Sequence, residues 1–425
     1  MAAITSHIET SVLQIGYQSA IQTASSNMRR ITQWGDGAPI ADAKRVVFAN
    51  TSANQRRRTG RPPILGPRAG GSVGFTVPLR GVPSVLNAAA TPVAFSNASA
   101  LPFQLLWRAI LGAELTPTAG SAVVGSTGTP VTAIEVTAGQ GSRFVIGQIL
   151  VVVISGTPYP RRVTNVSTDT LTISPPLPSG VAPSVADIVR STYCYYPGER
   201  DSTTFTLEHA QVEASGAVTQ RRAIGCYGSG EINLPTNEVA SVAYSGTSVN
   251  HTDPADLSIG TNPAAELDGD SLVWTPEYRL ADTVSTAPDV AEISSVKINI
   301  PRSWQIVPGS VVNGIGSVHE VAGRDQPITI DVEGLFDAAW WTAFEASTDY
   351  TFFAHTSYGT GTSARIAGFH AGVTRINGTP VVTALGKLFA CKFQLTCEVD
   401  TTITGANPAL STAEIRTANL IFYNG

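Results

Sequence analysis

A serine with the spacing of a nucleophile occurs early in the chain. The stretch GGSVG at 70–74 matches GxSxG, the pattern in which a serine on a tight turn attacks a substrate. That chemistry requires a strand before the turn and a helix behind the serine. Ser72 instead leads into a segment of alternating apolar and polar residues, which is typical of a strand. We therefore assign Ser72 no catalytic role.

Acidic and histidine side chains could hold a metal ion, and their spacing argues against it. The acidic residues near the middle of the chain are Asp253, Asp256, Glu266, Asp268 and Asp270. They lack the regular ligand positions of a calcium loop, so we interpret them as a solvated linker. The six histidines are His7, His209, His251, His319, His355 and His370. They form no HExxH motif and no pair at i and i+4, and we expect no metal and no cofactor.

A glycoside hydrolase would need two suitably placed carboxylates. Glu208 and Glu333 are candidates, but both fall on the polar side of an expected strand. Exposure to solvent explains both, so we expect no catalytic pair and predict that the protein is not an enzyme.

The strongest charge feature is the basic run NQRRRTGRPPILGPR at 54–68. Its cations are Arg56, Arg57, Arg58, Arg61 and Arg68. Guanidinium groups suit phosphate, so contact with nucleic acid is one interpretation, and an ordinary solvated loop is another. One basic loop in a chain of net charge −5 is a weak signature of nucleic-acid binding. We favour a docking arm that contacts another subunit or another ring.

The composition of the 425 residues predicts that the elements positioning these groups are strands. Charged residues are only 14%, whereas the chain has 39 Gly and 27 Pro, which favours turns over helices. The four cysteines show no zinc spacing and are expected to be reduced core residues. No segment has the roughly 20 apolar residues that span a bilayer, and the first residues do not read as a signal peptide. We expect a cytoplasmic protein with no membrane insertion.

A β unit is expected to occur twice. FTVPLRG at 75–81 and ITIDVEG at 328–334 both alternate apolar and polar residues and end on Gly, as strands with one buried face do. A short amphipathic helix is expected after each, over 102–112 and 337–346. The residues predicted to form the helix cores are Leu106, Trp107, Ile110, Trp340, Trp341 and Phe344.

The same order continues after each helix. A strand is expected at 203–209 and again at 350–356, and two similar phrases follow, AIGCYGSG at 223–230 and RIAGFHAG at 365–372. A last strand at 391–399 alternates, which directs Cys391, Cys397 and Val399 to one face. This agreement in order predicts an internal duplication.

The first copy carries additional residues. A run of short β-like pieces between Gly, Pro and Asn turns predicts a small inserted β domain at 116–192, projecting outward from a solvent-facing loop. The expected domains are therefore a first unit (1–115 and 193–245), the insert (116–192), a linker or arm (246–289) and a second unit (290–425). The predicted fold is mainly β, with two tandem sandwich-like units, each with a flanking helix.

The order of these elements resembles the tail tube, or major tail, proteins of long-tailed bacteriophages. The resemblance covers most of 30–245 and, more faintly, 290–400. It implies a twisted β-sandwich whose inner sheet joins those of its neighbours around a channel. Family members usually place six such domains in a ring, so two domains in one chain imply a trimer with pseudo-sixfold symmetry.

The resemblance also implies a function and partners. Stacked rings would form a conduit for genome delivery with a polar to acidic lumen, and the arm from about 46 to 68 would contact the next ring. The implied partners are other copies of this chain stacked head to tail, tail terminator and tail tip proteins, and a tape-measure protein and DNA in the lumen. The implied location is the virion tail, with assembly in the host bacterial cytoplasm. A receptor- or carbohydrate-binding minor tail protein or adhesin is the alternative, and an exposed aromatic platform would favour it.

Overall fold

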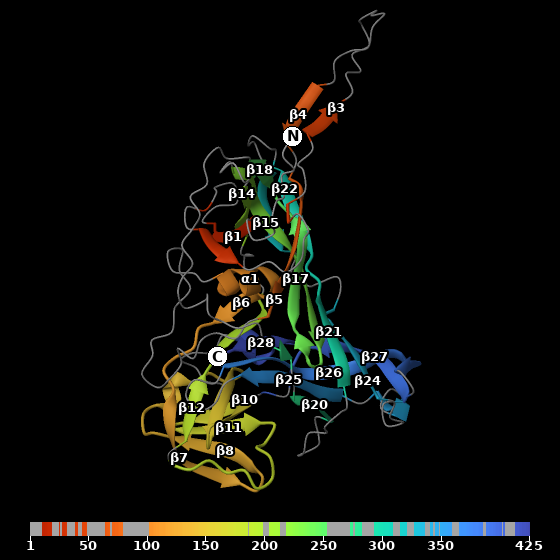
Figure 1. The fold of residues 1–425 in the computed structure, drawn as a ribbon. Coiled ribbons are helices and arrows are strands. Elements are labelled where there is room, and N and C mark those ends of the chain that lie inside the picture. The colour runs from red at the N-terminus through yellow and green to blue at the C-terminus, as the bar shows by residue number, and fades with distance from the viewer. Residues whose placement is uncertain are drawn as a thin grey trace, which may run out of the picture.

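The protein is mainly β throughout the part that can be described. The structure is a computed structural model, and it describes residues 11–18, 25, 28–31, 39–40, 45–48, 64–68, 70–79, 102–185, 187–198, 204–212, 218–252, 273–274, 277–282, 293–308, 315–320, 327–335, 341–342, 345–347, 349–358, 365–385, 388–401, 403 and 413–425. Most strands belong to one antiparallel sheet of 16 strands, which runs through both halves of the chain, and a separate closed barrel lies beside it (Figure 1).

Seven strands of the large sheet, here called the central sheet, pair side by side in an order that mixes the two halves. In that order they are β5 (Ser72–Pro78), β17 (Ser241–Thr247), β15 (Val218–Pro235), β21 (Ile293–Ile300), β24 (Thr329–Leu335), β27 (Leu388–Glu398) and β26 (Arg365–Leu385). Neighbours are antiparallel at every step. The two halves are therefore joined edge to edge through β15 and β21.

The two halves repeat one pairing pattern. The long strand β15 pairs with β14 (Phe205–Val212) over its first part and with β17 over its second part. The long strand β26 pairs in the same way with β25 (Asp349–Tyr358) and then with β27. The similar phrases at 223–230 and 365–372 lie where each long strand passes into the central sheet.

The last glycine of each phrase is required by close packing. A Cβ atom added to Gly230 would lie 2.5 Å from Cγ2 of Ile110 in the helix α1 (Pro102–Leu111). A Cβ atom added to Gly372 would collide with the carboxylate of Asp400. In both strands a side chain from another element packs directly against the glycine, Ile110 in the first and Asp400 in the second. A larger residue than glycine would occupy the space that this side chain fills.

The outer strands complete the sheet on both sides of this arrangement. They are β1 (Ser11–Tyr17), β2 (Met28–Ile31), β18 (Asn250–Thr252), β20 (Glu277–Asp282), β13 (Tyr193–Pro197), β6 (Gly112–Leu115) and β28 (Ile421–Asn424). β1 and β2 extend the sheet beyond β14, and β20 extends it beyond β25. The C-terminal strand β28 lies between β26 of the second half and β13 of the first half. The expected second unit at 290–425 therefore reaches back into the first.

Three short ribbons lie outside the large sheet. They are β3 (Arg45–Phe48) with β4 (Ile64–Arg68), β22 (Trp304–Pro308) with β23 (Ile315–Glu320), and β16 (Glu238–Val239) with β19 (Val273–Trp274). β18, β19 and β20 fall within the expected linker at 246–289, so parts of that segment form strands. The β3–β4 hairpin lies at one end of the molecule and the barrel at the other (Figure 1).

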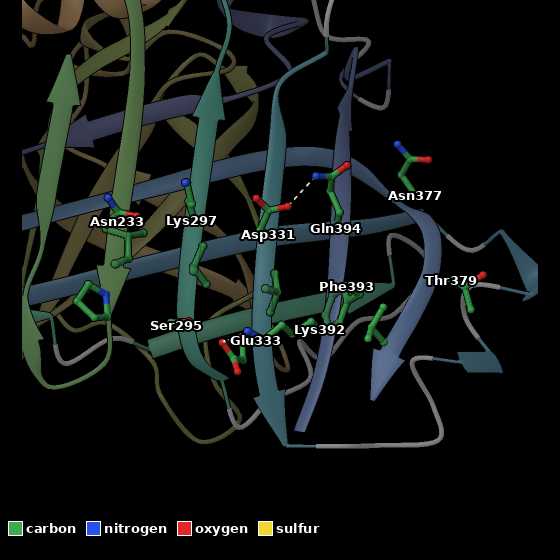
Figure 2. A pocket seen from close by; sticks show the side chains of 15 residues that line it. Asn233, Ser295, Lys297, Asp331, Glu333, Asn377, Thr379, Lys392, Phe393 and Gln394 are labelled. Carbon is green, nitrogen blue, oxygen red and sulfur yellow. Dashed lines mark hydrogen bonds and ion pairs between the residues drawn. The ribbon is translucent and has the colours of Figure 1, made fainter. Parts of the chain in front are cut away.

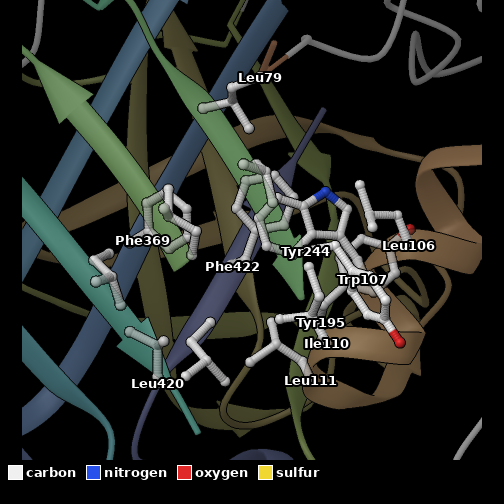
Figure 3. Close-up of a cluster of buried hydrophobic side chains, with 14 of the residues drawn as sticks. Leu79, Leu106, Trp107, Ile110, Leu111, Tyr195, Tyr244, Phe369, Leu420 and Phe422 are labelled. Carbon is white, nitrogen blue, oxygen red and sulfur yellow. The ribbon is translucent and has the colours of Figure 1, made fainter. Parts of the chain in front are cut away.

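One hydrophobic core serves both halves. Trp107 on α1 stacks on Phe422 of β28, with ring centroids 3.8 Å apart, and it also contacts Phe369 of the second phrase. Leu106 and Ile110 of α1 are buried in the same cluster, as expected for the helix core, and Figure 3 shows these side chains together. Burial of apolar area from both halves in one cluster means that neither half has a complete core of its own.

The inserted segment contains a six-stranded closed barrel. Its strands are β7 (Ser121–Gly128), β8 (Val131–Val136), β9 (Ile149–Ile154), β10 (Thr157–Ser167), β11 (Thr170–Ser174) and β12 (Ile188–Ser191), with a short 3-10 turn at Gly141–Arg143. Leu150 and Val152 of β9 point into the barrel core. The intervening Val151 and Val153 pack against a second cluster that contains Phe353 and Tyr423. The barrel is thus docked on the outer strands of the second half, although its sequence interrupts the first.

Two sequence expectations about side-chain burial are wrong. Val399 was expected on the buried face of the last strand, but β27 ends at Glu398 and Val399 is 58% exposed. Trp341 was expected in a helix core, but it is 39% exposed, and its indole N–H donates to Glu345, four residues later. Trp340 and Phe344 lie outside the described residues.

Candidate functional site: the polar face of the central sheet

The central sheet has one apolar and one polar face because its strands alternate. Residues at even positions of β15, such as Ile232 and Leu234, are buried, whereas the odd positions between them point the other way. The cross-strand register places the polar residues of six neighbouring strands on this same side, here called the polar face. They are Thr76, Ser245, Ser229, Glu231, Asn233, Ser295, Lys297, Asn299, Thr329, Asp331, Glu333, Lys392, Gln394 and Thr396.

The charges of the polar face are paired with one another. Lys297 Nζ lies 2.8 Å from Glu231 Oε2, and Lys392 Nζ lies 3.1 Å from Glu333 Oε2. Each pair joins neighbouring strands. Glu231 of β15 lies diagonally across from Lys297 of β21, and Glu333 of β24 lies directly opposite Lys392 of β27. Such half-exposed pairs contribute little stability, but they leave no excess positive charge on either lysine.

Amide groups surround the remaining carboxylate, that of Asp331. Asn299 Nδ2 donates to Oδ2 over 2.9 Å, and Gln394 Nε2 donates to Oδ1 over 2.7 Å. Figure 2 shows Asp331 and Gln394 with the neighbouring Asn233, Ser295, Lys297, Glu333 and Lys392, which help to line a pocket of about 540 Å³. The face therefore presents amides, hydroxyls, two ion pairs and the Asp331 carboxylate, a surface that makes hydrogen bonds without strongly attracting an anion.

The carboxylates considered for hydrolysis do not meet on this face. Glu333 belongs to β24 and is paired with Lys392, whereas Glu208 belongs to β14 outside the central sheet. Solvent exposure was expected for Glu208, and that expectation is wrong: the side chain is fully buried and ion-paired with Arg222. Burial raises the pKa of Glu208, and the hydrogen bond and charge of Arg222 oppose that rise.

The central sheet ends in two edges that lack a strand partner within the described part of the chain. On the side of β5 away from β17, the described contact is an isolated bridge from Ile40 to Val73. On the far side of the sheet, β25 covers β26 as far as Arg375, and no described strand pairs with that side from Ile376 onward. Unpaired backbone donors and acceptors of this kind form a template for another strand.

The predicted docking arm is only partly visible. Arg68 is the last residue of β4 and lies opposite Arg45 in the hairpin, whereas Arg56, Arg57, Arg58 and Arg61 lie outside the described residues. The second half also has a hairpin, β22–β23, between β21 and β24. This hairpin of the second half occupies the place that β3–β4 occupies in the first half. Its sequence, 304–320, contains no arginine.

The remaining sequence candidates do not assemble into a centre. Ser72 is the first residue of β5, so a strand follows it where a nucleophile would need a helix. The acidic set at 253–270 lies outside the described residues. Within the described ranges, no group of three or more His, Cys, Asp or Glu side chains could hold a metal ion. The four cysteines are free and buried.

The polar face as a whole was missed in the sequence, although a signal for it exists. Alternation was recognised around Asp331 and Gln394, but the same pattern in β21, with Ser295, Lys297 and Asn299 alternating against apolar residues, was overlooked. That strand joins the two halves of the face.

Comparisons with known proteins identify no relative. No model of a known protein family matches the chain, and no curated protein matches it at a significant level. Among the helices of the described residues, none is long and apolar enough to cross a membrane.

Proposed function

We propose that this protein is the structural subunit of a long-tailed bacteriophage tail tube, and that it polymerises into stacked rings that conduct the genome. The observation that carries the proposal is the central sheet itself. It combines a polar face, an apolar face packed on the shared core, and two edges without a strand partner in the described residues. A sheet of this kind is completed when copies join edge to edge around a hole.

The repeated pairing pattern sets the proposed number of chains. β5, β14, β15 and β17 in the first half pair as β24, β25, β26 and β27 do in the second. If each half is one tube unit, three chains supply six units. The junction of β15 with β21 inside the chain would then be the model for the junction between chains, and the ring would have pseudo-sixfold symmetry.

The charge pattern of the polar face supports a lumen for DNA. A conduit must be wetted without holding phosphates, and Lys297 and Lys392 are each neutralised by a neighbouring glutamate. In this proposal the protein makes and breaks no bond, and it binds no cofactor.

The β3–β4 hairpin is proposed to contact the next ring, with the arginine run from Arg56 to Arg68 as its docking surface. The proposed partners are further copies of the chain, terminator and tip proteins at the two ends, and a tape-measure protein and DNA in the lumen. Assembly would take place in the bacterial cytoplasm, and the final location would be the virion tail.

Electron microscopy of the purified protein tests the proposal. Hollow rings or tubes are the expected result at high protein concentration. Single chains that stay dispersed at every concentration would contradict it and would favour a receptor- or carbohydrate-binding module instead.

A further inference from the structure

The two central hairpins of the repeat end differently. In the first half, β15 and β17 are joined by a short connection, and the tip touches the second half of the same chain. Thr236 donates its N–H to Ser294 O over 3.0 Å, and Val239 in the tip pairs with Val273. The junction between the repeats therefore contacts this tip at Thr236 and Val239, while Asn237 and Glu238 stay exposed.

The corresponding hairpin of the second half is longer and uncovered in the described residues. β26 continues to Leu385 and pairs with β27 up to Leu388. Near its tip, Val381 is 57% exposed, Val382 48% and Phe389 71%. The register places Val382 and Phe389 on one face of the hairpin and Val381, opposite Lys392, on the other, so both faces of the tip expose apolar side chains that can form a contact.

The edge of β26 leading to this tip is divided in two. A bulge between Asn377 and Val381 contains Gly378, which has a φ of +83°, and Pro380, which has no N–H to donate. Strand pairing with another chain is thus available before the bulge, at Ile376 and Asn377. Beyond the bulge, the contact would rest on the apolar side chains.

We infer that this tip, represented by the described residues 381–385 and 388–389, docks on the first half of a second copy of this chain, as the tip of the first hairpin contacts the second half within one chain. The inference rests on the proposed ring, and it names the surface that decides side-by-side association. The occupant follows from the repeat: Ser294, which Thr236 of the first tip contacts, belongs to the next unit, and after the second unit the next unit is another chain.

Replacement of Val381 and Phe389 by Ser in the full chain tests the inference. Both side chains are exposed, so the thermal unfolding midpoint should stay unchanged, whereas the concentration at which chains associate should rise about tenfold or more in sedimentation velocity. Val185→Ser is the matched control, because Val185 is 72% exposed but lies in the barrel segment. A double variant that associates at the same concentration as the control overturns the inference.

A second measurement identifies the surface in contact. Val382→Cys introduces an accessible thiol in a chain whose four natural cysteines are buried, so a photoreactive maleimide will attach there selectively. Cross-linked peptides should come from 1–115 or 193–245 of a second chain, and cross-links only to the barrel or to the second half overturn the inference. If rings form but the tip variants behave as wild type, only this inference fails. If the wild-type chain never associates, the proposed function fails with it.

Discussion

The ion pair between Arg162 and Asp400 should hold the barrel to the second half of the chain. Arg162 belongs to β10 of the barrel, and its Nη1 lies 2.5 Å from Asp400 Oδ2, with both side chains about 2% exposed. Its Nη2 donates to the carbonyl oxygens of Ile415, over 3.2 Å, and Arg416, over 2.9 Å. Burial lowers the pKa of Arg162, and the charge of Asp400 opposes that effect.

Asp400→Asn removes the counter-charge and leaves a buried guanidinium. Loss of one partner of a buried pair costs about 3 to 5 kcal/mol, which is roughly a 150-fold to 5000-fold increase in the population with the barrel detached. The same substitution at an exposed pair is the matched control. Asp349 pairs with Arg375, and these side chains are 37% and 48% exposed, so Asp349→Asn should cost less than about 1 kcal/mol.

Hydrogen exchange measured by mass spectrometry is the suitable assay, because a chain with several packed parts has no single free energy of unfolding. Exchange in β9, β10 and β28 should accelerate strongly in Asp400→Asn and hardly at all in Asp349→Asn. The double variant Arg162→Met, Asp400→Leu should recover much of the protection, because it buries neither charge. Equal exchange in the two Asn variants would refute the assignment of Arg162 as the clamp.

Three further predictions concern the core and its titration. Gly230→Ala should weaken the packing of α1 on β15 by about 1 to 3 kcal/mol, seen as faster hydrogen exchange in β15, because the new methyl meets Ile110, whereas Gly74→Ala should be tolerated, because its nearest neighbour would lie 3.6 Å away. Trp107→Ala should cost about 3 to 5 kcal/mol and accelerate exchange in β28, because the ring stacks on Phe422; unchanged exchange there would contradict the shared core. Burial raises the pKa of Glu114 from 4.5 to about 7, against the opposing charge of Arg108, so the folded state holds a proton that the unfolded chain releases. Stability should therefore fall as pH rises from about 4.5 through 7, by at most about 3 kcal/mol, and Glu114→Gln should flatten this dependence in thermal melts at pH 5 and 8.5.

Local pattern was enough to predict individual strands. Alternation in FTVPLRG and ITIDVEG predicted β5 and β24, and the two glycine phrases marked the long strands β15 and β26. The periodicity of 102–112 predicted the buried stripe of α1. Each of these signals lies within about ten residues, where burial of one face determines the spacing of apolar residues.

Long-range pairing could not be predicted in the same way. The pairing of β15 with β21, and the return of β28 between β26 and β13, depend on which edges meet after collapse, and no local spacing encodes that choice. Arg162 illustrates the limit for side chains. A strand arginine is normally exposed, and its burial follows only from the distant Asp400 and from the carbonyl groups at 415 and 416.

The burial of Trp341, an expected helix-core residue, was mispredicted. The stripe expected from Trp340, Trp341 and Phe344 resembles that of α1, but Trp341 is turned outward and bonded to Glu345. Aromatic spacing alone does not say whether another element covers the stripe.

Native mass spectrometry of the smallest assembly, combined with class-averaged electron micrographs, tests the central claim most directly. A particle with three times the mass of the 44.4 kDa chain, and a central hole surrounded by six similar lobes, is the predicted result. A closed particle without a hole, or a ring built from six chains, would contradict the account.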